Sequence, residues 1–172
     1  MSAKNWPVVS LWIKQSEGGF VNNRRDPGGA TNYGITLRTL MAWRHRPVSV
    51  ADVRSLQWSE AVAIIKSQYA DTVHFDDLPS GLDYCVVDAA VNSGPVKAIQ
   101  WLQRSLGIAA DGHYGIQTAA AVAGVNDVRG AIERYDAARL GFMRHLRTWP
   151  FFGSGWFARV NLVTKRAEAL AA

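Results

Sequence analysis

One carboxylate, Glu17, stands at the end of an apolar segment, and a glycine-rich stretch with a second carboxylate, Asp26, follows it. The stretch reads SEGGFVNNRRDPGGATNYGIT, from Ser16 to Thr36. A helix C-terminus and partial burial both disfavour an ionised acid, so Glu17 is expected to keep its proton near neutral pH. A protonated carboxyl beside an apolar surface, together with an ionised one in a polar loop, is the pair that glycosidases use.

A simpler interpretation of both carboxylates stays open. A glutamate at a helix end is usually just solvated, and Asp26-Pro-Gly-Gly is ordinary turn chemistry. Two glycines leave the space beside Glu17 free of side chains. Hydroxyl and amide groups follow the second carboxylate, at Thr31, Asn32 and Tyr33. From the pattern alone, these residues are candidates for a glycosidase site.

The segments around this stretch have mostly helical periodicity. Apolar residues from Val8 to Ile13 share one face of a helix that Gly18-Gly19 would end. Thr36 is expected to cap a short helix with Leu37, Leu40 and Met41 facing inward. Ser59 is expected to begin another helix. Between the first two helices, Phe20-Val21 and Tyr33–Ile35 predict a small hairpin.

The remaining residues also predict helices. Residues 80–94 are very apolar and predict a helix through the middle of the core, and Pro95 fits the first turn of the next helix. A short alanine-rich helix is expected to end at Gly124. Asn126 is expected to cap the longest helix, which Trp149-Pro150 would end, and a last helix follows. We predict a mainly α protein with a small irregular or β-hairpin segment near residues 18–36.

Composition limits the partners. The 172 residues fit one domain, and 19 Lys and Arg against 14 Asp and Glu give a net charge of +5. That charge suits a polyanion such as an anionic cell envelope. The basic residues are scattered, without a basic helix face or an aromatic platform, so we expect no nucleic-acid partner. The single cysteine, Cys85, excludes an intramolecular disulfide, and the four histidines lack ligand spacing, so neither metal nor cofactor is expected.

The N-terminus lacks the pattern of a signal peptide, and no stretch approaches the roughly 20 apolar residues of a membrane span. We therefore expect a protein that is made in the cytoplasm and does not span a membrane. If it acts on the cell wall, it needs release through a pore or a dedicated export route.

The stretch EGGFVNNRRDPGGATNYGIT closely resembles the signature of glycoside hydrolase family 108, which contains phage endolysins and bacterial N-acetylmuramidases. DAAVNSGP resembles the D-x-x-x-N-x-G element of that family. AIQWLQRSLGIAADGHYGIQTAAAV and GWFARV resemble the peptidoglycan-binding segment that accompanies the hydrolase. The resemblance implies one lysozyme-like α-helical domain over residues 1–172. About 1–93 would be the catalytic part, and about 94–172 a helical peptidoglycan-binding part packed against it.

Within this resemblance, Glu17 is the catalytic acid. The order Glu, Asp, Thr also looks like the trio of phage-type lysozymes, which points to Asp26 and Thr31. The second element implies that Asp88 and Asn92 lie near the same groove, where Asn32 and Tyr33 would also contact substrate. Asp88 lies in an apolar run, and we favour a structural role in which it hydrogen-bonds the backbone of the Gly28–Thr31 loop. Asn92 either joins it or contacts sugar.

The expected activity is hydrolysis of the β-1,4 bond between N-acetylmuramic acid and N-acetylglucosamine in peptidoglycan, by a monomeric, cell-lysing endolysin. A lytic transglycosylase, which needs only one glutamate, would release 1,6-anhydro sugars from the same bond. A non-catalytic module that binds the wall through its charge is the alternative from another class. Released muropeptides would exclude the binding module, and their mass would separate the two enzymes.

Overall fold

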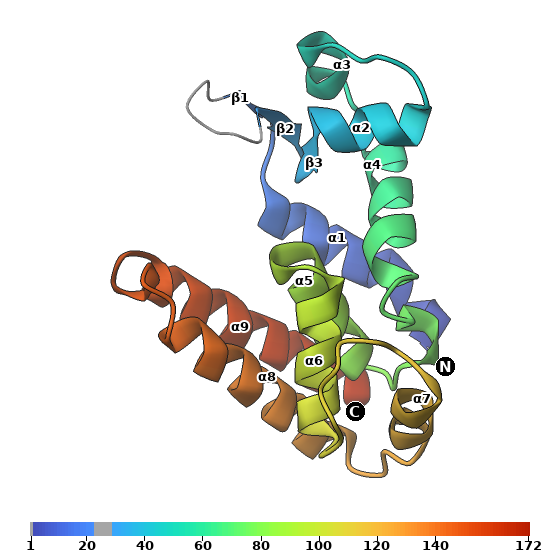
Figure 1. Ribbon diagram of the computed structural model, residues 1–172, viewed down its shortest axis with the longest axis vertical. Helices are drawn as coiled ribbons and strands as arrows, with labels where there is room; N and C mark the ends of the chain where they lie inside the picture. Colours follow the sequence, from blue (N-terminus) through green and yellow to red (C-terminus); the bar gives the residue numbers. More distant parts are fainter. Residues whose placement is uncertain (1, 23–28) are drawn as a thin grey trace. The chain divides into compact units, whose positions relative to one another are not determined.

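The computed structural model describes residues 2–22 and 29–172. The chain forms two compact units. Pro7–Gln68 make the N-terminal unit, and Met1–Trp6 together with Tyr69–Ala172 make the C-terminal unit. The elements of both units are labelled along the chain in Figure 1. In the described residues, nine α-helices and one small sheet confirm the mainly α prediction.

The N-terminal unit contains four α-helices and the sheet. Helix α1 (Trp6–Glu17) runs into it and ends where Gly18 adopts a positive φ of 69°, as the paired glycines predicted. The sheet consists of β1 (Val21–Asn22), β2 (Ala30–Asn32) and β3 (Ile35–Thr36). Three short helices follow: α2 (Leu37–Arg44), α3 (Val50–Arg54) and α4 (Trp58–Ile65).

The sheet is three-stranded and antiparallel, in the order β1-β2-β3. A small sheet near residues 18–36 was predicted, but the predicted pairing of Phe20-Val21 with Tyr33–Ile35 is wrong, because Val21 pairs with Thr31 of β2. Tyr33 and Gly34 connect β2 to β3, and both have positive φ, 52° and 75°. Two such residues between antiparallel strands form a type I′ turn, whose twist matches that of the strands. The turn therefore fixes the register in which Asn32 faces Ile35.

One arginine ties the three short helices together. Arg44, the last residue of α2, donates two hydrogen bonds to Glu60 of α4, at 2.8 and 2.7 Å, and one to Asp52 of α3, at 3.1 Å. Asp52 also completes a capping box with Ser49 at the start of α3. A bidentate pair of this kind fixes orientation better than a single contact does.

The C-terminal unit is a bundle of five α-helices with shorter turns. It begins with the 3₁₀ turn η1 (Ser2–Asn5), and the π-helix η2 (Lys66–Ala70) leads back into it. The 3₁₀ turn η3 (Phe75–Asp77) precedes α5 (Leu82–Ser93) and α6 (Pro95–Ser105). Helices α7 (Ile116–Ala123), α8 (Val128–Arg144) and α9 (Trp149–Ala171) complete it, with α8 and α9 forming a hairpin in Figure 1.

Helix α5 is the centre of this bundle, as its apolar sequence predicted. Every residue from Leu82 to Ala90 is buried, and α6, α8 and α9 all pack against the helix. Gly81 precedes it at φ 92°, and a Cβ there would lie 2.3 Å from the carbonyl oxygen of Ala167 in α9. The start of α5 thus approaches the α9 backbone more closely than any side chain would permit.

Several predicted boundaries and orientations are wrong. Met41 is 40% exposed, while Leu40 alone of α2 is buried. Asp127, not Asn126, caps α8 by accepting from the Gly130 amide at 2.9 Å. The longest helix is α9, and Pro150 lies in its first turn, where a missing N–H costs nothing, so it begins a helix instead of ending one. The helix predicted to begin at Ser59 starts at Trp58.

Candidate active site

Glu17 is the last residue of α1 and is half-buried. Its carboxylate lies against the β2–β3 turn, because a Cβ added to Gly34 would come within 2.7 Å of Glu17 Oε2. Gly34 is thus glycine for two reasons: its φ is positive, and the Glu17 carboxylate occupies the space of a side chain. Sequence reasoning missed Gly34, although Asn-Tyr-Gly between short apolar segments is a recognisable turn signal.

Lys14 lies one helical turn before Glu17 on α1, and two aromatic rings face it. Its Nζ is 5.8 Å from the Tyr33 ring centre and 5.2 Å from that of Trp58. Tyr33 and Trp58 meet edge to face, with ring centres 5.4 Å apart. Trp58 was absent from the predicted site. This cluster fixes the turn that bears Gly34 against α1 through cation–π and aromatic contacts.

Asn32 has a structural role in this unit. It is 5% exposed, and its amide donates to the carbonyl oxygens of Val53, at 3.0 Å, and Arg54, at 3.2 Å. These bonds satisfy carbonyls at the end of α3, which no residue of that helix can reach. Asn32 therefore ties β2 to α3, and its predicted contact with substrate stays a prediction.

Thr31 faces away from Asn32, because successive strand residues alternate between the two faces of a sheet. It is half-buried in the middle of β2, opposite Val21 and Thr36. Asp26, the second predicted carboxylate, lies outside the described residues. Its proposed role can be tested with the variant Asp26→Ala.

Asp88 is fully buried in the C-terminal unit and is held by two arginines. Arg139 Nη1 of α8 lies 2.8 Å from Asp88 Oδ2, and Arg159 Nη2 of α9 lies 2.9 Å from Oδ1. Burial alone would raise the pKa of Asp88, but the charges and hydrogen bonds of Arg139 and Arg159 outweigh it and lower the pKa. This favours the structural role. The predicted bond to the Gly28–Thr31 loop includes residue 28, outside the described residues, and stays a prediction.

Asn92 is exposed near the end of α5, where it accepts a hydrogen bond from Ser93. It lines a cleft of about 170 Å³ in the C-terminal unit, together with Ser93, Phe142, Met143, Leu146 and Trp156. Its predicted contact with sugar stays a prediction. Trp101, by contrast, is 1% exposed and belongs to the core.

A second buried carboxyl, Asp136, lies near Asp88. It accepts a hydrogen bond from Thr164 of α9 at 2.7 Å and faces the thiol of Cys85 at 3.7 Å. Burial raises the pKa of Asp136 to about 6, although the Thr164 hydrogen bond and the Arg139 charge act in the opposite direction. Burial, with the neighbouring Asp136 charge, also raises the pKa of the Cys85 thiol well above its usual value. Sequence reasoning missed this network.

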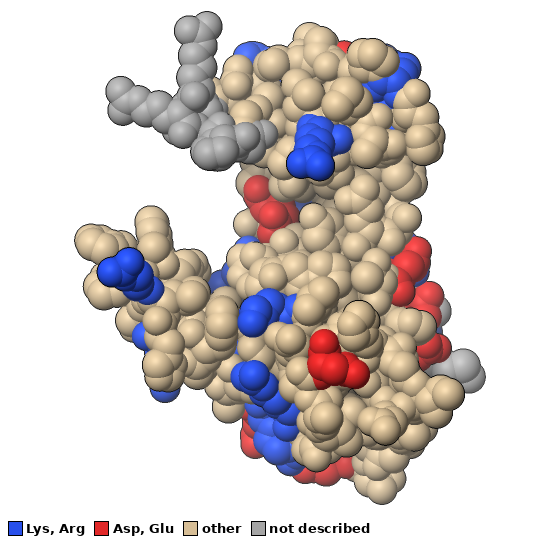
Figure 2. All heavy atoms as spheres, in the orientation of Figure 1, with Lys and Arg blue, Asp and Glu red and all other residues tan. Residues whose placement is uncertain are grey.

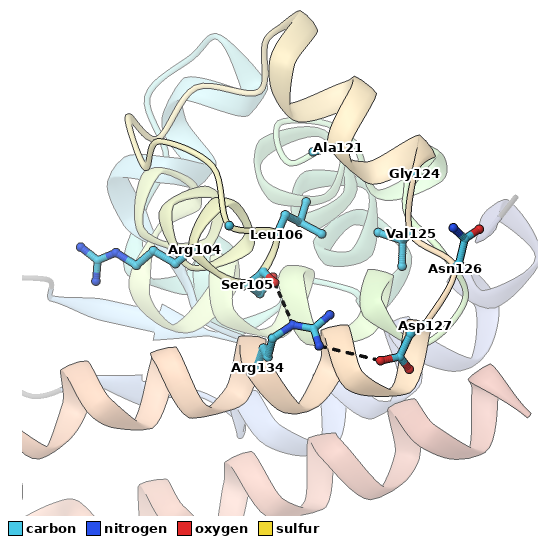
Figure 3. A pocket seen from close by; sticks show the side chains of 10 residues that line it. Arg104, Ser105, Leu106, Ala121, Gly124, Val125, Asn126, Asp127 and Arg134 are labelled. Carbon is cyan, nitrogen blue, oxygen red and sulfur yellow. Dashed lines mark hydrogen bonds and ion pairs between the residues drawn. The ribbon is translucent and has the colours of Figure 1, made fainter.

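An open cavity of about 610 Å³ lies where α6, α7 and α8 meet (Figure 3). Arg134 crosses its floor, donating to the Ser105 carbonyl at 3.0 Å and lying 3.8 Å from Asp127. Arg104 projects from its opposite side in Figure 3. The carboxylate in its lining, Asp127, caps α8 and lies beside Arg134.

The N-terminal unit therefore places one carboxyl at a helix end, against the glycine of a two-residue turn. The model of the family Glycosyl hydrolase 108 matches residues 11–94, which include this entire arrangement. Among solved structures, SagA of Brucella abortus is similar to the chain over 98% of this chain and 96% of its own, with 40% sequence identity and a TM-score of 0.86. The chain belongs to glycosyl hydrolase family 108.

This family 108 protein is a glycoside hydrolase, and the family points to peptidoglycan as its substrate. Agreement over nearly the whole length of SagA also confirms the predicted lysozyme-like, mainly α fold class. A search of curated proteins finds no match to the chain.

The described part of the hydrolase places no three His, Cys, Asp or Glu side chains where they could together bind a metal ion. Across residues 2–22 and 29–172, no helix is both long enough and apolar enough to cross a membrane.

Proposed function

We propose that this family 108 hydrolase is an N-acetylmuramidase that cleaves the β-1,4 bond between N-acetylmuramic acid and N-acetylglucosamine. Glu17 acts as the general acid and protonates the oxygen that leaves. The observation that carries the proposal is the contact of the Glu17 carboxylate with Gly34, because it fixes the acid at the end of α1 against a residue that has no side chain. Fixed position of the proton donor is a large part of such catalysis.

In this proposal, Asp26 supplies the second carboxylate. It either positions the attacking water or stabilises the positive charge that develops on the sugar, and Thr31 helps to hold the water. The separation of the two carboxyl groups decides the stereochemical outcome, with about 5 Å for retention and about 6.5–9.5 Å for inversion. Asn92 is proposed to contact the glycan, and the helical segment from about residue 94 onward to bind the wall.

Because peptidoglycan lies outside the cytoplasmic membrane, the protein must reach it from its place of synthesis. We propose that it acts as a monomeric endolysin released through a pore, or reaches the wall by dedicated export. The net charge of +5 supports contact with an anionic envelope.

Glu17→Gln tests the central assignment. Glutamine keeps the size of the side chain but cannot donate the proton, so release of muropeptides from purified sacculi should fall by at least about a hundredfold while the fold is retained. Glu133→Gln, at an exposed position of α8, is the matched control and should keep wild-type activity. Substantial lysis by Glu17→Gln would end the assignment.

Asp26→Ala tests the second carboxylate in the same assay. A loss of activity comparable to that of Glu17→Gln supports a catalytic role, whereas a mild effect makes Asp26 a turn former. Mass spectrometry of the products checks the reaction itself. Hydrolysis leaves reducing ends, while 1,6-anhydro sugars, lighter by one water, would instead identify a lytic transglycosylase.

A further inference from the structure

Five aromatic residues gather at the end of the α8–α9 hairpin, over residues 149–157. We call them the aromatic tip: Trp149, Phe151, Phe152, Trp156 and Phe157. Phe151 is 80% exposed, Phe152 57% and Phe157 43%. Soluble monomers rarely leave a group of large apolar side chains open to water unless it binds something.

The aromatic tip is held in shape from beneath. Trp149 lies across Gly153, where an added Cβ would come within 2.6 Å of its indole ring. Trp156 packs against Trp149 and Phe152, with ring centres 6.1 and 5.9 Å apart. The two tryptophans are half-buried and form the base, so the more exposed phenylalanines project from an ordered support.

The charge around the aromatic tip is of one sign. From Ala137 to Ala167 the sequence contains no Asp or Glu, while Arg144 and Arg147 are exposed next to the tip. Figure 2 agrees, since the end of this hairpin, at the left, shows Lys or Arg and no Asp or Glu on the visible face. Helix α9 also begins here, and its N-terminus adds partial positive charge. The partner that fits is therefore anionic.

The residues around the aromatic tip discriminate between two anionic partners, the glycan of the cell wall and a phospholipid membrane. From Ala137 to Val160 there is no Asn, Gln, Asp or Glu, the side chains that usually hydrogen-bond sugar hydroxyls. Exposed phenylalanines have no polar atom for such bonds either. Aromatic side chains with arginines at their edge instead match the interface of an anionic bilayer, where rings enter the headgroup region and cations meet phosphate.

We propose that the aromatic tip docks the protein onto the surface of an anionic phospholipid membrane, with Phe151 and Phe152 inserted among the headgroups and Arg144 and Arg147 against the phosphates. This docking does not depend on the proposed hydrolysis. It gives the protein a second surface, which holds it at the membrane that borders the wall.

The test is flotation of the full chain with vesicles of phosphatidylethanolamine and phosphatidylglycerol, and separately of phosphatidylcholine alone. We expect binding to the anionic vesicles only. Phe151→Ser with Phe152→Ser should weaken it by at least about tenfold, and Arg144→Ser with Arg147→Ser should weaken it and reduce its dependence on salt. Ile116→Ser is the matched control, because Ile116 is 90% exposed on α7 of the same unit, outside the aromatic tip. It should bind like the wild type.

Absence of wild-type binding to anionic vesicles would overturn the proposal, as would equal loss in the Ile116→Ser variant. Binding to lipid-free sacculi that depends on Phe151 and Phe152, without vesicle binding, would assign the tip to glycan instead. Circular dichroism and thermal unfolding of each variant separate loss of binding from loss of fold. Because the readout is binding, an inactive Glu17→Gln protein should float like the wild type, which keeps this test separate from that of the proposed function.

Discussion

A methyl group at position 34 would collide with the carboxylate of Glu17, so the geometry of the acid depends on a residue that has no functional group. The contact joins the end of a helix to a two-residue turn, and each is set by its own local rule. Gly18 ends the helix, and the pair Tyr33-Gly34 makes the turn. The position of the Glu17 carboxylate therefore depends on backbone shape as much as on side-chain chemistry.

We predict that Gly34→Ala lowers activity strongly and stability only slightly. The positive φ of 75° should cost about 1 kcal/mol in unfolding free energy, but the new Cβ also displaces the Glu17 carboxylate. Gly107→Ala is the control, since Gly107 has nearly the same φ, 71°, and no atom within 4 Å of an added Cβ. Urea unfolding should show the same loss of stability in both variants. Activity on sacculi should be lost only in Gly34→Ala. Full activity in that variant would exclude a role for the contact.

At this scale the sequence singled out Glu17 as the candidate acid but not the residues that surround it. Glu17 could be singled out because its place after an apolar helix and before two glycines is local information. Lys14 and Trp58 come from segments 44 residues apart, so no local pattern could bring them together. Asn32 was chosen for its polar amide, but that amide is used to bind the end of α3.

At the scale of elements, buried charge joins the three central helices of the C-terminal unit. Asp88 of α5 is held by Arg139 of α8 and Arg159 of α9, and Asp136 of α8 bonds Thr164 of α9. Within the described residues, Asp136 Oδ1 and two nitrogens of Arg139 have no hydrogen-bond partner. A carboxyl with one unsatisfied oxygen in such a place is more stable with its proton.

We predict that Asp136 makes the fold less stable as pH rises. Its pKa is about 6 in the folded protein against 3.8 in the unfolded chain, so the folded state binds more protons between these values. Its contribution is fully present below about pH 3.8 and lost as pH rises through 6. The difference between the two pKa values corresponds to roughly 3 kcal/mol of unfolding free energy at most.

Urea unfolding of wild type and Asp136→Asn at pH 4.5 and 7.5 checks this prediction. The stability of the variant relative to wild type should improve on going to the higher pH, because asparagine has no proton to lose. Glu133→Gln, at an exposed carboxylate of α8, is the control and should show little change. A constant difference between wild type and Asp136→Asn would contradict the shifted pKa.

The elements themselves were mostly predictable from periodicity, and their ends less so. Helix α5 stood out because nearly all its residues are apolar, which is expected only of a central helix. Pro150 was misplaced because proline is found both just after helices and in their first turn, and only the fold decides between them. Strand β2 was missed because a three-residue strand carries almost no pattern.

At the scale of the whole molecule, the excess of five positive charges is spread along the sequence, with no basic run longer than two residues. Such a field acts at long range and brings the protein to an anionic surface, while short-range contacts decide where it binds. Exposed charges are screened within about 10 Å at 0.1 M salt.

We predict that binding to whole sacculi weakens as ionic strength rises from about 0.05 to 0.5 M, since the Debye length falls severalfold over this range. Co-sedimentation with sacculi measures it directly. Chitin, a neutral β-1,4-linked glycan, is the control and should bind with little dependence on salt. Salt-independent binding to sacculi would exclude a role for the net charge in wall attachment.

The single thiol has a practical consequence. Cys85 lies inside α5, fully buried, with a raised pKa that leaves little thiolate to react. A cysteine placed on the surface, for example at residue 151 or 116, would then be modified by maleimide reagents while Cys85 stays unlabelled. The natural sequence thus already permits site-specific fluorophores or spin labels, without first removing a native cysteine.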